Sequence, residues 1–111
     1  MYSCVYVIYA REGMTADEFA DHWINVHGEI AKRQPRLQRL ELFPVTSSEG
    51  ELGPAVAGFA VMEFLTKEDF NFAGAGEVMD ESLADVPNFA RHIAAYTVTG
   101  HRIVEPQTDQ R

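Results

Sequence analysis

The residue best suited to acid–base chemistry is His27. It follows Trp23 by four residues and precedes Ile30 by three, so it falls on the apolar stripe of an expected helix. A neutral histidine in a pocket can remove a proton next to a carbonyl group and return it elsewhere. On an apolar stripe the same residue can instead be a hydrogen-bonded core residue. The sequence leaves both interpretations open, with His27 as the first catalytic candidate.

A second histidine, His22, lies one residue before Trp23 at the border of the same stripe. His22 and Trp23 are both candidate ligand contacts. His22 and His27 are five residues apart, which is about 500° of rotation in a regular α-helix, so their side chains are expected to point roughly 140° apart. From such a helix they cannot bind one metal ion together. We therefore expect no metal site.

Three further candidates fall on expected strands. Tyr6 is the second catalytic candidate, because its hydroxyl could donate a hydrogen bond to an oxygenated substrate; otherwise its ring packs in the sheet. Arg39 could bind a carboxylate or a developing enolate, or could lie on a solvated or dimer-rim face. Phe59 is a candidate ligand contact. Cys4 is the only cysteine, which rules out an internal disulfide and a cysteine-based zinc site.

The elements that must position these residues are expected in the order β-α-β-β-α-β. The predicted strands cover residues 3–10, 37–45, 56–64 and part of 93–104; the predicted helices cover 15–34 and 66–85, the second broken at Gly74–Gly76. Thr15 and Glu18 form a capping box. Pro44 indicates an edge or a strand end, Gly58 a close backbone approach or bulge, and residues 46–55 a hairpin loop.

This order predicts a ferredoxin-like α+β fold, in which a four-stranded antiparallel sheet carries both helices on one face. The first and third predicted strands have apolar residues on both faces. A strand without a polar face is covered on both sides. A second copy of the chain packed against the free sheet face is the simplest cover, so we expect a homodimer.

Composition limits the classes of partner. The 111 residues suit one domain, residues 1–111, with a polar tail from about residue 105. Seventeen acidic residues against nine basic ones give a net charge of −8, which repels phosphate backbones and anionic lipid. We therefore expect neither nucleic acid nor membrane as a partner. The apolar run near the N-terminus is too short for a signal peptide, and the expected location is the cytoplasm.

Two segments of the chain resemble the EthD family of dimeric α+β barrel proteins. The first is GMTADEFADHWINVHGEIA at residues 13–31, with its Gly-Met-Thr start followed by Phe19, Trp23 and His27. The second is LADVPNFA at residues 83–90, before the last predicted strand. The resemblance implies a ferredoxin-like protomer whose sheet pairs with that of a second protomer. It also implies a pocket between sheet and helices, toward which His27 would point.

Relatives with assigned chemistry in that family resemble cofactor-free enzymes: a methylmuconolactone isomerase, and dehydratases or decarboxylases of polyketide pathways. By resemblance, this chain would need no cofactor. It would hold a small, oxygenated, largely apolar or aromatic metabolite and act on it as an isomerase, dehydratase or decarboxylase, for instance in catabolism. The chain departs from the isomerase pattern, since Leu37-Gln38-Arg39 stands where a pocket tyrosine would be expected.

Two alternatives accompany this expectation. The name-giving member of the family is associated with an ether-degrading oxidation system, so the chain could be a non-catalytic protein that holds a metabolite for a partner oxidase. Other dimeric α+β barrels bind haem, and a single histidine such as His27 or His92 could be an axial ligand in a haem-type monooxygenase.

Overall fold

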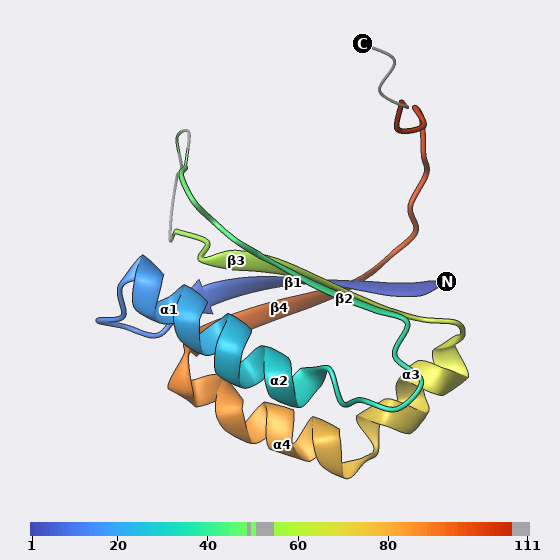
Figure 1. Ribbon diagram of the computed structural model, residues 1–111, viewed down its shortest axis with the longest axis horizontal. Coiled ribbons are helices and arrows are strands. Elements are labelled where there is room, and N and C mark those ends of the chain that lie inside the picture. The colour runs from blue at the N-terminus through green and yellow to red at the C-terminus, as the bar shows by residue number, and fades with distance from the viewer. Residues whose placement is uncertain (49, 51–54, 108–111) are drawn as a thin grey trace.

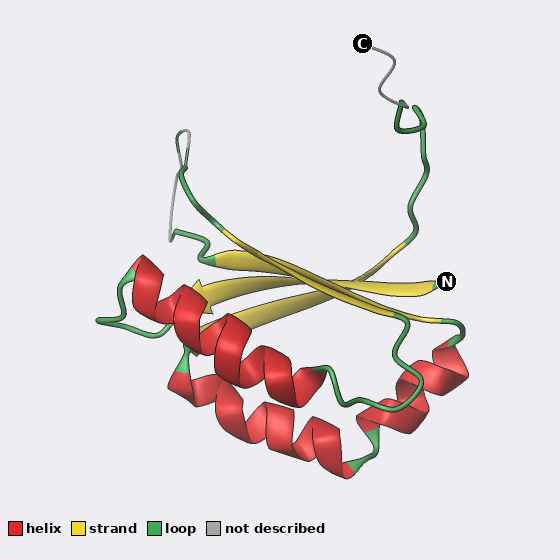
Figure 2. Cartoon of the chain, in the orientation of Figure 1, coloured by secondary structure: helices red, strands yellow, loops and turns green. Residues whose placement is uncertain are grey.

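The computed structural model describes residues 1–48, 50 and 55–107, and these form one sheet with a layer of helices on one of its faces (Figures 1 and 2). The order of elements confirms the ferredoxin-like prediction. The strands are β1 Tyr2–Ala10, β2 Arg39–Pro44, β3 Gly58–Phe64 and β4 Ala90–Val98; the helices are α1 Ala16–His22, a π-helical segment Trp23–His27, α2 Gly28–Ala31, α3 Lys67–Gly74, α4 Glu77–Asp85 and a 3₁₀ turn Val86–Asn88.

The four strands are antiparallel in the order β2-β3-β1-β4. Pro44 ends the edge strand β2, where the missing N–H costs no ladder hydrogen bond. The last strand begins at Ala90, earlier than the predicted Ile93. The reason is the end of β1: the Arg11 N–H donates to the Phe89 carbonyl at 2.8 Å, so pairing with β1 continues past a bulge at Ala10.

The first helix begins with the predicted capping box. The Glu18 N–H donates to Thr15 Oγ1 at 3.1 Å, and the Thr15 N–H donates back to Glu18 Oε1 at 2.9 Å. Thr66 caps α3 through a single hydrogen bond, which the Asp69 N–H donates to Thr66 Oγ1. Gly76 separates α3 from α4, as the sequence predicts. The predicted loop 46–55 lies partly outside the described residues, since 49 and 51–54 are not described.

The main core lies between the sheet and the helix that carries Trp23. Trp23 is 2% exposed and packs with Phe19, Ile8 and Phe89. Gly58 on β3 makes this packing possible, because a Cβ there would lie only 2.5 Å from Trp23 Cζ3. The predicted close approach at Gly58 is therefore that of the indole ring against the sheet.

The opposite face of the sheet carries exposed apolar side chains. Phe43 and Phe59, which are register partners on β2 and β3, are each 41% exposed, and Tyr96 on β4 is 57% exposed. Within the described part of the chain, all helices lie on the other face (Figure 1). This surface, defined by Phe43, Phe59 and Tyr96, is called the open sheet face below.

No helix among the described residues is long and apolar enough to cross a membrane.

Candidate functional site

A π-helical turn brings the two candidate histidines together. Between α1 and α2 the Gly28 N–H donates to the Trp23 carbonyl, five residues back, instead of four. A turn closed by five residues places residue i+5 nearly above residue i. The predicted divergence of His22 and His27 is therefore wrong, because it assumed a regular α-helix. Val26, which lies within the π-helical turn, is 43% exposed.

Both histidines bind one buried carboxylate, that of Asp85 at the end of α4. His22 Nε2 lies 2.9 Å from Asp85 Oδ1, and His27 Nδ1 lies 3.0 Å from Asp85 Oδ2. Asn88 Nδ2 donates a third hydrogen bond to Oδ1 at 3.0 Å. The Asp85 side chain is 7% exposed, so it is a buried acceptor with donors on both oxygens.

This arrangement determines which nitrogen of His27 is free. An ionised carboxylate can only accept hydrogen bonds, so a neutral His27 carries its proton on Nδ1 and has its lone pair on Nε2. No described residue forms a hydrogen bond with Nε2. The ring also packs against Phe89, with centroids 4.6 Å apart, which fixes its orientation. His27 is thus held in the tautomer required of a general base.

The electrostatics favour a neutral His27 next to an ionised Asp85. Burial lowers the pKa of His27 below its ordinary value; the hydrogen bond and negative charge of Asp85 offset this only in part. Burial raises the pKa of Asp85, but hydrogen bonds from Asn88, His22 and His27 outweigh it and hold that pKa below its ordinary value. At neutral pH the pair is therefore a carboxylate and an uncharged imidazole.

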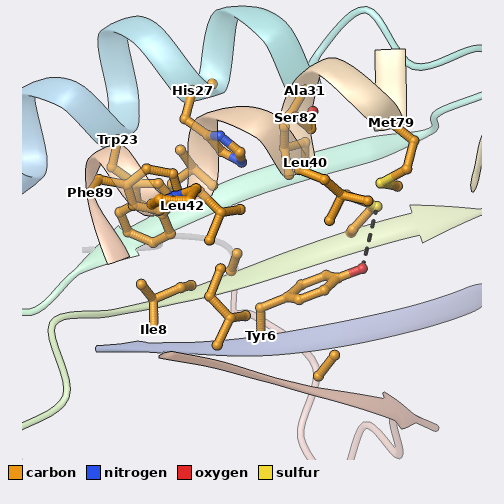
Figure 3. Close-up of a pocket in the computed structure, with 18 of the residues that line it drawn as sticks. Tyr6, Ile8, Trp23, His27, Ala31, Leu40, Leu42, Met79, Ser82 and Phe89 are labelled. Atoms are coloured by element: carbon orange, nitrogen blue, oxygen red, sulfur yellow. Dashed lines mark hydrogen bonds between the residues drawn. The ribbon is translucent and has the colours of Figure 1, made fainter. Parts of the chain in front are cut away.

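His27 faces a cavity of about 580 Å³ between the helices and the sheet (Figure 3). Apolar side chains from both layers make up most of its wall: Ile8, Trp23, Leu40, Leu42, Met62 and Phe89. The His27 side chain is only 15% exposed. A largely apolar cavity of this size with a few polar groups is typical of a site for a small molecule.

Tyr6 lines the same cavity from the sheet side, on β1 (Figure 3). Its hydroxyl donates to Met62 Sδ at 3.8 Å, which is a weak acceptor that a ligand oxygen can readily replace. The pKa of Tyr6 is raised to about 12, mainly by burial and to a smaller extent by the neighbouring Cys4. The hydroxyl therefore keeps its proton at neutral pH and is available as a donor.

The structure does not bring every sequence candidate into this cavity. Trp23 lines it together with His27 and Tyr6, whereas His22 does not line it and is linked to His27 only through the Asp85 carboxylate. Arg39 lies on the opposite sheet face and pairs with Glu41 and Glu63. Phe59 belongs to the open sheet face as well. Arg39 and Phe59 were predicted as ligand contacts, but alternation along β2 and β3 turns both away from the cavity of their own chain.

Three residues of the site were not predicted from the sequence: Asp85, Gln34 and Ser82. All three are buried, and the last two line the cavity. Asp85 carried a usable signal. It lies in the segment 83–90 that resembles the EthD family, three residues before Asn88, which is the spacing that lets Asn88 hold the carboxylate. No comparable sequence signal exists for Gln34 or Ser82.

Solved structures share this architecture over nearly the whole chain. An EthD family protein of Bacillus halodurans is 16% identical, with a TM-score of 0.72 over 91% of this chain and 100% of that one. The fold is EthD-like. A dimeric ferredoxin-like protein of unknown function from Thermobifida fusca is 11% identical, with a TM-score of 0.67 over 87% of this chain and 88% of that one.

A third similar structure is that of SnoaB of Streptomyces nogalater, a cofactor-independent oxygenase. It is 11% identical to this chain, with a TM-score of 0.68 over 95% of this chain and 97% of SnoaB. No protein-family profile matches the sequence, and no curated protein matches it. At these identities the comparisons establish the fold alone, so the chemistry must be argued from the site itself.

Proposed function

We propose that this chain is a cofactor-free acid–base enzyme that acts on a small, oxygenated, largely apolar metabolite. The observation that carries the proposal is His27, whose Nδ1 is held by the buried Asp85 while Nε2 has no hydrogen-bond partner among the described residues and the ring faces an apolar cavity. A histidine oriented by a carboxylate is a recurrent form of general base.

The first step would be removal of a proton from a carbon next to a carbonyl group. The C–H bond breaks, its proton passes to His27 Nε2, and its electron pair moves onto the carbonyl oxygen as an enolate. The Tyr6 hydroxyl is the donor available to stabilise that oxygen. The resulting imidazolium, next to Asp85, can return the proton to a different carbon, which completes an isomerisation. In a dehydration, the same enolate would expel a hydroxyl group, which leaves as water with the proton of the imidazolium. In a decarboxylation, an enolate would form by loss of carbon dioxide instead of a proton, and its carbon would then take up a proton.

Deuterium exchange tests this chemistry without knowledge of the natural substrate. Benzylacetone is a neutral aromatic ketone, and proton NMR in deuterium oxide reports the loss of the hydrogens next to its carbonyl. We expect the protein to accelerate this exchange over an equal concentration of imidazole, with a rate that saturates as the ketone concentration rises. An acceleration no greater than that of imidazole, for a ketone shown to bind, would refute the general base.

The alternative function is that of a protein that only holds a metabolite, including one that serves a partner oxidase. The apolar cavity suits this role equally well, but the role has no use for a base held in one tautomer. The exchange experiment separates the two functions, since a holding protein would bind benzylacetone and leave its exchange unchanged.

We also propose that the chain is a homodimer, paired through the open sheet face. Aromatic residues at 41–57% exposure on that face support the pairing, because burying them stabilises association. The similar protein of Thermobifida fusca is described as dimeric and ferredoxin-like, which favours a second copy as the cover.

The Phe59→Glu variant tests the dimer. It places a charge on an inner strand of the open sheet face, and we expect a mass near 12.4 kDa by sedimentation, where the wild type is expected to show twice that mass. The matched control is Phe72→Glu on α3, because Phe72 is 53% exposed and lies outside the sheet. A wild type that stays monomeric at high concentration, or a dimeric Phe59→Glu variant, would contradict this pairing.

A further inference from the structure

His22 belongs to the same polar cluster as His27 but does not line the cavity. Its Nε2 lies 2.9 Å from Asp85 Oδ1, while His27 Nδ1 lies 3.0 Å from Asp85 Oδ2. Both rings also pack against Phe89, with centroids 5.8 Å and 4.6 Å from that of the phenyl ring. Two histidines are thus fixed on the two oxygens of one buried carboxylate.

Each histidine keeps one ring nitrogen free for a further proton. His22 Nε2 donates to the carboxylate, so a neutral His22 has its lone pair on Nδ1, whereas His27 has its lone pair on Nε2. Neither free nitrogen has a hydrogen-bond partner among the described residues, and neither belongs to the buried unpartnered atoms of that part of the chain. Both nitrogens are therefore accessible, and either ring can become an imidazolium without losing its bond to Asp85.

One carboxylate favours one positive charge and not two. The first imidazolium pairs with Asp85 at hydrogen-bond distance, which stabilises its charge. A second imidazolium would meet a carboxylate that is already neutralised and a like charge on its other side, so the two protonations oppose each other. The cluster therefore holds a single extra proton over a range of pH.

The surroundings of the two rings decide which of them takes that proton. The His22 side chain is 24% exposed, and the His27 side chain is 15% exposed. The His27 ring faces a largely apolar wall, where a charge loses more hydration than it does near the surface (Figure 3). The first proton therefore goes to His22.

No other ionisable group competes with Asp85 for the two rings. Within the described part of the chain, Asp85 is the only residue that forms an ion pair with either histidine. All other ionisable side chains on the surrounding elements are exposed, except that of Tyr6, which keeps its proton at neutral pH. The exposed ones are Asp17, Glu18, Asp21 and Glu29 on the helical run from α1 to α2, Glu77, Asp80 and Glu81 on α4, and Arg91 and His92 on β4. Exposed charges are screened by solvent, so Asp85 and the two rings govern the protonation of the cluster.

We infer that His22 is a positioning residue for the base: it takes the proton that the cluster gains as the pH falls, and so keeps His27 unprotonated. The inference rests on the proposed function for the role of His27 as a base, but the order of protonation does not depend on any reaction. Burial lowers the pKa of His27 most, and against the opposing effect of Asp85 a positive charge on His22 lowers it further. The base would thus remain active at a more acidic pH than a histidine that shares Asp85 with no second ring.

The wild-type protein provides the first test. NMR of the histidine ring nitrogens and protons follows each imidazole separately as the pH is lowered. We expect the His22 ring to take its proton at a higher pH than the His27 ring. A His27 ring that takes its proton first would overturn the inference.

The His22→Gln variant tests the effect of the His22 charge on His27. Glutamine can donate to Asp85 Oδ1 as His22 does, but its amide takes up no proton in this range of pH. We expect His27 in this variant to take its proton at a higher pH than in the wild type, the opposite direction to loss of the Asp85 charge. We expect benzylacetone exchange roughly three- to tenfold slower at acidic pH, where part of His27 is protonated, and a smaller loss at high pH.

His22→Lys is the conservative variant, because lysine restores a positive charge beside Asp85. We expect His27 in this variant to take its proton at the wild-type pH or below it. His101→Gln is the control for loss of one histidine, since His101 is exposed and does not line the cavity, and we expect it to leave the titration of His27 unchanged. Circular dichroism verifies that each variant is folded.

Two results from the variants would also overturn the inference. One is a His27 titration in folded His22→Gln that coincides with the wild type or moves to lower pH. The other is a move to higher pH in both His22→Gln and His22→Lys, which would indicate altered packing and not charge. If the titrations follow the expected order but the wild type does not accelerate benzylacetone exchange, the general base is refuted and the order of protonation stands.

Discussion

We expect the His27→Gln variant to exchange the hydrogens of benzylacetone about a hundred- to ten-thousand-fold more slowly than the wild type, the range typical for loss of a positioned general base. Glutamine keeps a hydrogen-bonding group toward Asp85, so the packing around Phe89 is largely retained. It offers no basic nitrogen to the cavity. NMR in deuterium oxide measures the rate, and calorimetry shows that the ketone still binds.

The control for this prediction is His101→Gln. His101 is exposed in the segment after β4 and does not line the cavity, so its loss removes one histidine without touching the site. We expect wild-type exchange from this variant. If His27→Gln exchanges as fast as the wild type while binding the ketone, His27 is not the base, and its place in the cavity wall is only structural.

The Asp85→Asn variant is expected to lower the exchange rate by about 10–100-fold on the plateau that the rate reaches at high pH, where His27 is unprotonated. The reason is that an amide no longer holds both histidines in one tautomer. One of its two polar atoms donates and the other accepts, so His22 and His27 cannot both donate to it as they donate to the carboxylate. Circular dichroism at each pH verifies that the variant remains folded.

The pH profile of the same variant distinguishes a positioning role from a purely structural one. Asp85 acts to raise the pKa of His27, through its hydrogen bond and its charge, against the dominant effect of burial. Without that charge the pKa of His27 falls further below its ordinary value. Since the base works only when unprotonated, we expect the acid limb of the exchange profile to move to lower pH, even as the plateau falls.

Glu81→Gln is the matched control on the same helix. Glu81 is half-exposed and pairs with Arg33 at 2.8 Å, away from His27. We expect its profile to coincide with that of the wild type. An Asp85→Asn profile with a lower plateau and an unmoved acid limb would mean that Asp85 supports the fold and does not tune His27.

Much of the architecture was predictable because local signals and the fold agree. Alternating apolar residues, the Thr15–Glu18 capping box and the glycines at 74 and 76 each specify a local conformation, and their order leaves the ferredoxin-like arrangement as the simplest one. The apolar stripe also identified Trp23 and His27 as residues that face the sheet. These properties depend on neighbours along the chain, which a sequence displays directly.

What the sequence alone determined is thus the fold, the general position of His27 and Tyr6, and the presence of a free apolar sheet face. Only the tertiary structure decided which residues the site contains. The π-turn brings His22 and His27 to one carboxylate, that of Asp85, 58 residues beyond His27, and the local pattern around the two histidines does not display this partner. Gln34 and Ser82 likewise belong to the cavity wall only because the chain packs around them, and burial is a property of the packed molecule.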